Sequence, residues 1–272
     1  MTVTPTQQSF ESSTPKPKRR WLQFNLRTLL VLTLVVGLGL GWVMYERRKN
    51  ARIQARIQTN LHALKRLGCN FEFYPDNSFR PSRFDWLLNR SDFGTVLVYF
   101  GSSTVTDAEL DHLKGLTNLH SLRLYGSPNT DAGLLHLKSF SNVRSLDLHR
   151  TEITDVGFAH LKGLTNLNFL SLSQTKITDA GLVHLKGLTN LNFLSLNETK
   201  ITDAGLVHLR GLTKLEKLKL TDTAITDSGL EKLKHLAQLT QLDLRWTKVT
   251  KSGVARLQKA LPNCTIYDDA IN

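Results

Sequence analysis

Short alternations of apolar and polar residues recur along most of this chain, and each is followed by apolar residues at wider spacing. In the segment FLSL, Leu194 and Leu196 alternate with other residues, which predicts a short strand with one buried face. A turn follows, and Leu206 and Leu209 then predict a helix with one apolar side. Gly211 ends that helix before the next strand begins. The basic unit is therefore strand, turn and helix.

This unit repeats every 24 residues. Residues 166–189 and 190–213 differ at only three positions. An unbroken period of this length indicates a stacked-repeat solenoid over residues 95–260, in which each repeat contacts only its neighbours. A Thr-Asp pair marks the expected helix start, at Thr106-Asp107, Thr130-Asp131, Thr154-Asp155, Thr178-Asp179, Thr202-Asp203 and Thr226-Asp227, and the series ends at Thr250-Lys251.

Three polar or small positions in each repeat have an expected structural role. The hydroxyl of Thr199, which recurs in other repeats, is expected to bond backbone groups of the turn. Thr202 or Asp203 is suited to cap the helix N-terminus. Gly205 is a poor helix former, so we expect close packing against the neighbouring repeat there.

The L-x-x-L-x-L strand followed by a helix, with the wording TDAGLxHLKGL, resembles the leucine-rich repeat as found in bacterial membrane-anchored proteins. The resemblance implies an α/β solenoid: a horseshoe with a concave parallel sheet and a full helix on the convex side of each repeat. Such horseshoes are most often used to bind other proteins, and the resemblance implies no reaction. The chain departs from the family in carrying Thr where many members carry Asn. Glu109 also replaces the Gly that is usual in this array.

The residues ahead of the array predict a membrane anchor. Residues 1–25 are rich in Ser, Thr, Gln, Pro and basic residues, which indicates a disordered basic tail. Residues 26–45 end in an uncharged apolar run with aromatic residues near both ends, close to the roughly 20 residues that span a bilayer. A buried core helix and a cleaved signal peptide are the alternatives. No A-x-A site follows, so an uncleaved transmembrane helix is favoured.

Three further segments flank the repeats. Residues 46–67 predict a juxtamembrane helix, whose apolar stripe fits either docking on the first repeat or self-association as a coiled coil. Residues 68–94 are rich in aromatic residues and depart from the repeat, which predicts an N-terminal cap. Residues 261–272 break the spacing and predict a C-terminal cap. The stripe of the juxtamembrane helix is Ile53, Ile57, Leu61, Leu64 and Leu67.

Charge changes the picture only at the N-terminus. The net charge is +12, but residues 1–60 hold ten Lys or Arg against two Glu, and the array is close to balanced. That argues against a nucleic-acid partner, which needs a basic stripe on the binding face. Positive residues are equally numerous on both sides of the predicted anchor, so they do not set its orientation. A short basic tail before a first apolar segment favours a single-pass protein with its repeats outside the cytoplasm.

The sequence predicts no enzyme, no cofactor and no metal. Neighbouring helix axes lie about 8–10 Å apart, whereas Zn–N bonds are about 2.0–2.1 Å, so a column of histidines does not make a metal ladder. No G-x-S-x-G, Cys-His, H-E-x-x-H or Walker-type signature occurs. Cys69 and Cys264 would lie about 30 Å apart in such a stack, too far for a disulfide. The histidines in register are His112, His136, His160, His184 and His208.

The remaining candidate is the concave face, where residues flanking the strand leucines point away from the core. Phe169 and Phe193 are expected to be exposed there among charges, as at an interface centre. Alternatively, the two rings only stack on one another, and the protein is a structural or self-associating component of the cell envelope. The predicted partner-binding residues are Tyr99, Arg123, Tyr125, Asp147, His149, Arg150, Phe169, Ser171, Phe193, Ser195, Asn197, Lys217, Lys219, Asp243, Arg245 and Trp246.

Overall fold

The computed structural model describes residue 38, residues 40–49, scattered positions between 51 and 66, and residues 69–74, 95–100, 105–114, 116 and 119–269. The chain divides into two compact units, Met1–Arg48 and Lys49–Asn272. In the first unit, residues 38 and 40–48 are helical. No helix among the described positions is both long and apolar enough to cross a membrane.

Several of the predicted N-terminal features lie outside the described residues. These are the tail over residues 1–25, most of the anchor over 26–45 and the apolar stripe of residues 46–67. The positions that are described within 46–67 are all helical. Of the segment 68–94, the structure describes one strand, β1 (Cys69–Tyr74).

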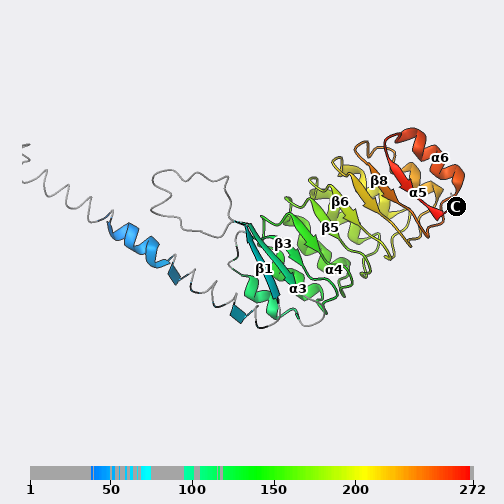
Figure 1. Ribbon diagram of the computed structural model, residues 1–272. Coiled ribbons are helices and arrows are strands. Elements are labelled where there is room, and N and C mark those ends of the chain that lie inside the picture. Colours follow the sequence, from blue (N-terminus) through cyan, green and yellow to red (C-terminus); the bar gives the residue numbers. More distant parts are fainter. Residues whose placement is uncertain are drawn as a thin grey trace, which may run out of the picture. The chain divides into compact units, whose positions relative to one another are not determined.

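Among the described residues of the second unit, nine strands form one sheet in chain order (Figure 1). The predicted parallel sheet is confirmed from β2 to β9, whereas β1 pairs antiparallel with β2 at the N-terminal edge. Parallel register places the first strand leucines side by side, as Leu170 against Leu194. The other strands are β2 (Thr95–Phe100), β3 (Leu119–Arg123), β4 (Ser145–Asp147), β5 (Phe169–Ser171), β6 (Phe193–Ser195), β7 (Lys217–Lys219), β8 (Gln241–Asp243) and β9 (Thr265–Tyr267).

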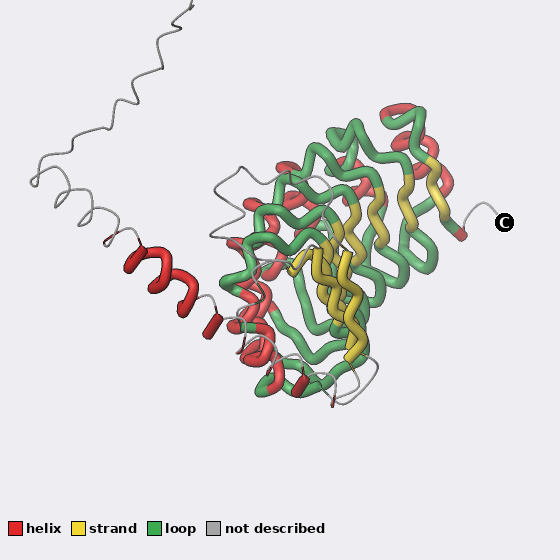
Figure 2. The backbone as a smooth tube through the Cα atoms, turned by 60° about the vertical axis from the view of Figure 1, so that its left-hand side comes forward, coloured by secondary structure: helices red, strands yellow, loops and turns green. Residues whose placement is uncertain are grey.

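Short helices line the side of the repeat array that lies opposite the sheet, as Figure 2 shows. The prediction of a full helix in each repeat is wrong for most repeats, because they carry 3-10 turns or short α-helices instead. Leu206, Leu209 and Leu212 are spaced by three, and a 3-10 helix has 3.0 residues per turn, so Leu206 and Leu209 face the core. The elements are η1 (Glu109–Leu113), α3 (Asp131–Leu137), α4 (Asp155–Phe158), η2 (Ala159–Gly163), η3 (Gly181–Gly187), η4 (Gly205–Gly211), α5 (Asp227–Glu231) and α6 (Lys251–Ala260).

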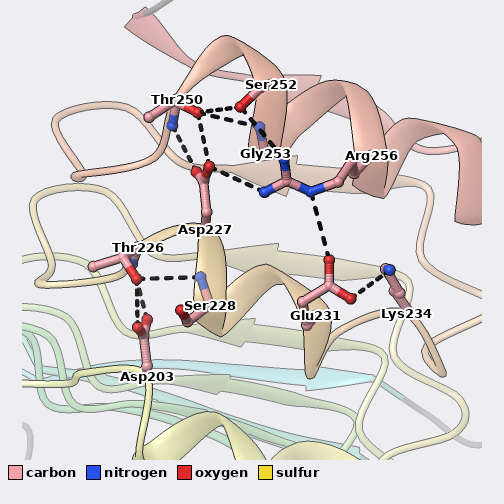
Figure 3. Close-up of polar contacts among 10 residues, drawn as sticks. All are labelled: Asp203, Thr226, Asp227, Ser228, Glu231, Lys234, Thr250, Ser252, Gly253 and Arg256. Atoms are coloured by element: carbon pink, nitrogen blue, oxygen red, sulfur yellow. Dashed lines mark hydrogen bonds and ion pairs between the residues drawn. The ribbon is translucent and has the colours of Figure 1, made fainter.

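An aspartate at each helix start holds the next repeat in place. Asp227 Oδ1 accepts a hydrogen bond from the Thr250 backbone N–H at 2.8 Å, and its Oδ2 accepts from the Thr250 hydroxyl at 2.7 Å (Figure 3). Thr250 Oγ1 accepts in turn from the Gly253 N–H, so the threonine is the N-cap, as predicted. We call this pair of hydrogen bonds, from the backbone N–H and the hydroxyl of a threonine to one aspartate, an Asp–Thr rung. The same rung joins Asp107 to Thr130, Asp131 to Thr154, Asp155 to Thr178, Asp179 to Thr202 and Asp203 to Thr226.

The close packing expected at Gly205 is confirmed, and its cause is this carboxylate. A Cβ on Gly205 would lie 2.3 Å from Asp179 Oδ1. The expected turn bond is confirmed as well, because Thr199 Oγ1 donates to the Leu196 carbonyl at 2.6 Å. Each repeat therefore joins its neighbour through a buried leucine, a strand ladder and an Asp–Thr rung.

Candidate functional site

The strand residues on either side of the buried leucines point out of the sheet, together with the residues that follow the strands. Relative to Leu194, these are Phe193 and Ser195 on β6, followed by Asn197 and Glu198. We call the surface made by these positions in β2–β9 the sheet face. Parallel register aligns equivalent residues in columns across it, about 4.8 Å apart from strand to strand.

The N-terminal part of the sheet face carries paired aromatic and cationic side chains. The Arg123 guanidinium lies 4.8 Å from the centroid of the Tyr99 ring. Tyr125 stacks on His149 with ring centroids 5.1 Å apart, and Arg150 Nη1 donates to Tyr125 Oη at 3.4 Å. Arg123, Tyr125 and Arg150 are exposed. The structure thus brings five predicted site residues into two contact groups, Tyr99 with Arg123 and Tyr125 with His149 and Arg150.

Phe169 and Phe193 form the centre of the sheet face. Their rings stack with centroids 4.4 Å apart and an interplanar angle of 8°. Both side chains are half-buried, so the expectation of exposed aromatics is wrong for this pair, because each ring covers one face of the other. Lys219 Nζ lies 5.7 Å from the Phe193 centroid, and Lys217 is exposed on the same strand.

Three of the predicted contact residues are buried and offer little surface to a partner. Ser171 is 7% exposed, Ser195 is 4% exposed and Asp243 is 7% exposed. Ser195 Oγ is hydrogen-bonded to Ser173 Oγ at 2.6 Å. Asn197 is half-buried, and its Oδ1 accepts from the Thr221 N–H at 2.9 Å.

The C-terminal part of the sheet face ends in an ion pair and an exposed tryptophan. Arg245 donates to both carboxylate oxygens of Asp243, at 2.9 and 2.7 Å. Burial raises the pKa of Asp243, but the hydrogen bonds from Arg245 outweigh it and hold that pKa below its ordinary value. Trp246, the next residue, is 68% exposed.

A row of left-handed residues runs along the rim of the sheet face. Arg150, Gln174, Glu198, Asp222 and Trp246 have φ between 51° and 58°, a region that favours glycine. The conformation turns each backbone N–H toward the next repeat, as when Glu198 donates to the Thr221 carbonyl at 2.8 Å. The sequence prediction missed Gln174, Glu198 and Asp222 as members of this row. The sequence signal for this row is Gly126, since a glycine at the equivalent position of an earlier repeat indicates a left-handed backbone, and its φ is 64°.

The opposite, helical side carries a different set of exposed side chains. Leu135, Val183 and Val207 occupy equivalent positions of their repeats and are 46–54% exposed, with the half-buried Ala159 at the position between Leu135 and Val183. The in-register histidines are half-buried there; His184, for example, meets Phe158 edge-on at 6.2 Å. Within the described part of the chain, no three His, Cys, Asp or Glu residues are grouped to hold a metal ion. The cation–aromatic pairs found in the structure lie on the sheet face.

Comparison with known proteins agrees with this architecture. Two family profiles described as leucine-rich repeat match residues 141–201 and 211–234. Internalin C2 from Listeria monocytogenes str. 4b F2365 is 28% identical, with 65% of this chain and 81% of that chain covered and a TM-score of 0.51. An internalin (inlF) from the same strain is 26% identical, with a TM-score of 0.50.

The matches to known structures cover only part of each chain. The match to the inlF internalin covers 58% of this chain and 43% of that chain, so the chain spans less than half of its length. No curated protein matches the chain. The profiles and both internalin structures agree on the repeat and on its parallel sheet. The repeats of this chain are therefore leucine-rich repeats, and the array that they build is a leucine-rich-repeat solenoid.

Proposed function

We propose that the sheet face binds a protein or peptide partner non-covalently. The observation that carries this proposal is the exposure of large aromatic side chains there: Tyr125 is 40% exposed and Trp246 is 68% exposed, each beside an arginine. Aromatic residues and arginine are enriched where proteins bind one another. Leucine-rich-repeat proteins typically serve as binding scaffolds rather than enzymes, which supports the same conclusion.

The backbone of the sheet face is rigid before a partner arrives. Strand ladders, buried leucines and Asp–Thr rungs fix each repeat on the next. A rigid surface avoids much of the ordering cost of association.

Site-specific photo-cross-linking tests the proposal. A photoreactive amino acid replaces Lys219 on the sheet face or, as a control, Lys186 on the helical side, both exposed lysines. In the cells that make the protein, we expect one defined adduct from position 219 and none from position 186. The cross-linked protein is then purified, and its affinity for the chain is measured directly. The same adducts from both positions would contradict a dedicated sheet-face partner.

We also propose that residues 26–45 anchor the chain in a membrane, with the array outside the cytoplasm. The support is the uncharged apolar run and the basic tail before it. Thr213 is exposed on the array, so Thr213→Cys provides a labelling site for a membrane-impermeant thiol reagent. Labelling in intact cells supports the orientation, and labelling only after permeabilisation contradicts it. Release of the protein from membranes by carbonate would contradict the anchor itself.

A second candidate function is self-association within the cell envelope. Val183 and Val207, exposed at equivalent positions of the adjacent helices η3 and η4, favour it, because apolar surface shared by neighbouring elements often marks an interface. Light scattering of the purified protein separates the two functions. An oligomer that Val183→Lys dissociates supports self-association, whereas a monomer at micromolar concentration excludes it.

A further inference from the structure

Three exposed cations of the sheet face form no ion pair with a carboxylate, unlike Arg245. The ion pairs among the described residues do not include Arg123, Lys217 or Lys219. Arg123 lies over the Tyr99 ring, and Lys219 approaches the Phe193 ring. These cation–aromatic contacts position the charges without neutralising them. Their charges therefore remain available to a partner.

Most carboxylates of the sheet face, in contrast, are already engaged within the chain. Asp147 Oδ1 accepts from the His149 N–H at 3.1 Å. Glu198 Oε2 accepts from Gln174 Nε2 at 2.7 Å, and Asp243 is paired with Arg245. Asp222 is the exception, but it lies in the left-handed row at the rim rather than on a strand. At the strand positions of the sheet face, the three cations Arg123, Lys217 and Lys219 outnumber the two carboxylates Asp147 and Asp243, so the charge there is net positive.

The unpaired cations lie at two places with an apolar platform between them. Arg123 is on β3, whereas Lys217 and Lys219 are on β7, four strand spacings away, which is about 19 Å. The stacked Phe169–Phe193 pair on β5 and β6 lies between them. Across the strands from β3 to β7, the sheet face therefore offers a cation, an aromatic platform and a second cationic group, in that order.

We propose that the partner presents an extended acidic segment with one apolar residue between two acidic groups. One acidic group lies at Arg123, the apolar residue covers the Phe169–Phe193 pair, and the second acidic group lies at Lys217 and Lys219. This inference rests on the proposed function and specifies its partner. Since an extended chain rises about 3.3 Å per residue, the acidic groups are about six residues apart.

A synthetic peptide tests this arrangement on the purified full-length protein. The probe carries two Glu-Glu pairs about six residues apart with one Leu between them and a fluorophore at its end. Anisotropy is expected to show binding that weakens as salt is raised, because exposed charges are screened. A peptide with Gln in place of Glu should bind at least about tenfold more weakly. Equal binding of the Glu and Gln peptides would overturn the acidic specificity.

Charge-matched variants locate the binding surface. Lys217→Gln with Lys219→Gln removes two exposed lysines from the sheet face. Lys162→Gln with Lys186→Gln removes two exposed lysines from the helical side and is the control. We expect about a tenfold loss of affinity for the Glu peptide from the first pair and no change from the second. Equal losses from both pairs would show binding through net charge alone and overturn the proposed site.

The two proposals fail in different ways. If the partner cross-linked from position 219 binds the sheet-face double variant as tightly as the wild type, its recognition is not acidic. The function as a binding surface then stands and the acidic segment is rejected. If no adduct forms from position 219 and the Glu peptide does not bind, both proposals are overturned.

Discussion

The carboxylate of Glu109 accepts hydrogen bonds from both the backbone N–H and the hydroxyl of Thr106. In each later repeat, the same two groups of the equivalent threonine donate to an aspartate of the preceding repeat, as Thr130 does to Asp107. Glu109 therefore supplies the carboxylate acceptor for Thr106 from within the same repeat. In later repeats, the aspartate of the preceding repeat supplies that acceptor. It also occupies the glycine position, which is unsuited to a side chain wherever that aspartate is present.

Replacing Glu109 is expected to loosen the N-terminal end of the array. Glu109→Ala leaves both donors of Thr106 without their acceptor, so we expect a loss of about 1–2 kcal/mol. Hydrogen exchange should show faster exchange over residues 105–113, with little change beyond Thr130. Glu152→Ala is the control, because Glu152 makes only an exposed ion pair with Lys176, worth less than about 1 kcal/mol. Equal effects of the two substitutions would contradict this role of Glu109.

Gly205→Ala is expected to destabilise the array, although alanine is the better helix former. The new methyl group would meet Asp179 Oδ1 at 2.3 Å and displace it from Thr202. We expect a loss of at least about 2 kcal/mol in urea unfolding. Gly211→Ala is the matched control, because the nearest atom to its new methyl group is 3.9 Å away.

The coupling between Gly205 and Asp179 provides a further check. Asp179→Ala removes the carboxylate that the Gly205→Ala methyl group would meet. The double variant should therefore cost less than the sum of the two single losses. Strictly additive losses would place the cause of the Gly205→Ala effect elsewhere.

Stability is expected to fall in acid because the pKa values of two rung aspartates, Asp107 and Asp227, are lowered in the folded chain. Backbone and side-chain hydrogen bonds from Thr250 hold the pKa of Asp227 below its ordinary value. For Asp107, burial raises the pKa, but the bonds from Thr130 outweigh it and the net shift is downward. A carboxyl with a lowered folded-state pKa stabilises fully above its unfolded pKa, near 4, and loses that contribution as pH falls toward the folded value.

Urea unfolding between pH 6 and about pH 3 measures this dependence. The wild type should lose stability below about pH 4, and Asp227→Asn should lose less over the same interval because position 227 no longer titrates. Identical pH slopes for the two proteins would contradict the contribution of this rung.

The strand and turn could be predicted from the sequence because the repeat itself encodes them. The alternation of Leu194 and Leu196 defines the buried face, and Thr199 closes the turn in each copy. The helix type on the opposite side could not be predicted from the repeat, because buried leucines spaced by three occur both in the 3-10 helix η4, at Leu206 and Leu209, and in the α-helix α3, at Leu134 and Leu137.

Side-chain exposure on the sheet face could not be predicted in the same way. Ser171 and Phe169 both point out of the sheet, yet Ser171 is buried and Phe169 is half-buried. The reason for Gly205 also depends on the next repeat, since it is the Asp179 carboxylate that excludes a side chain. Such properties arise from contacts between repeats, which a single repeat does not reveal.

Cys264 is expected to resist thiol reagents in the folded protein. The residue is 3% exposed at the C-terminal end of the core, and burial raises the pKa of its thiol to about 11. Because the thiolate is the reactive form, labelling at neutral pH should be slow. Peptide mass analysis should find Cys264 modified after denaturation and unmodified before it. Rapid labelling of the native protein would show that the C-terminal end opens readily.

Trp246→Gly is expected to stabilise the array while weakening its binding. A non-glycine residue in the left-handed region costs about 1–2 kcal/mol, and Trp246 adopts φ of 58° with most of its side chain exposed. Glycine removes that strain but adds freedom to the unfolded chain, so we expect a net gain of about 0.5 kcal/mol in urea unfolding. Affinity for the cross-linked partner should fall several-fold, because an exposed aromatic anchor is lost. A variant that gains stability without losing affinity would show that the strain at Trp246 serves the turn and not the partner.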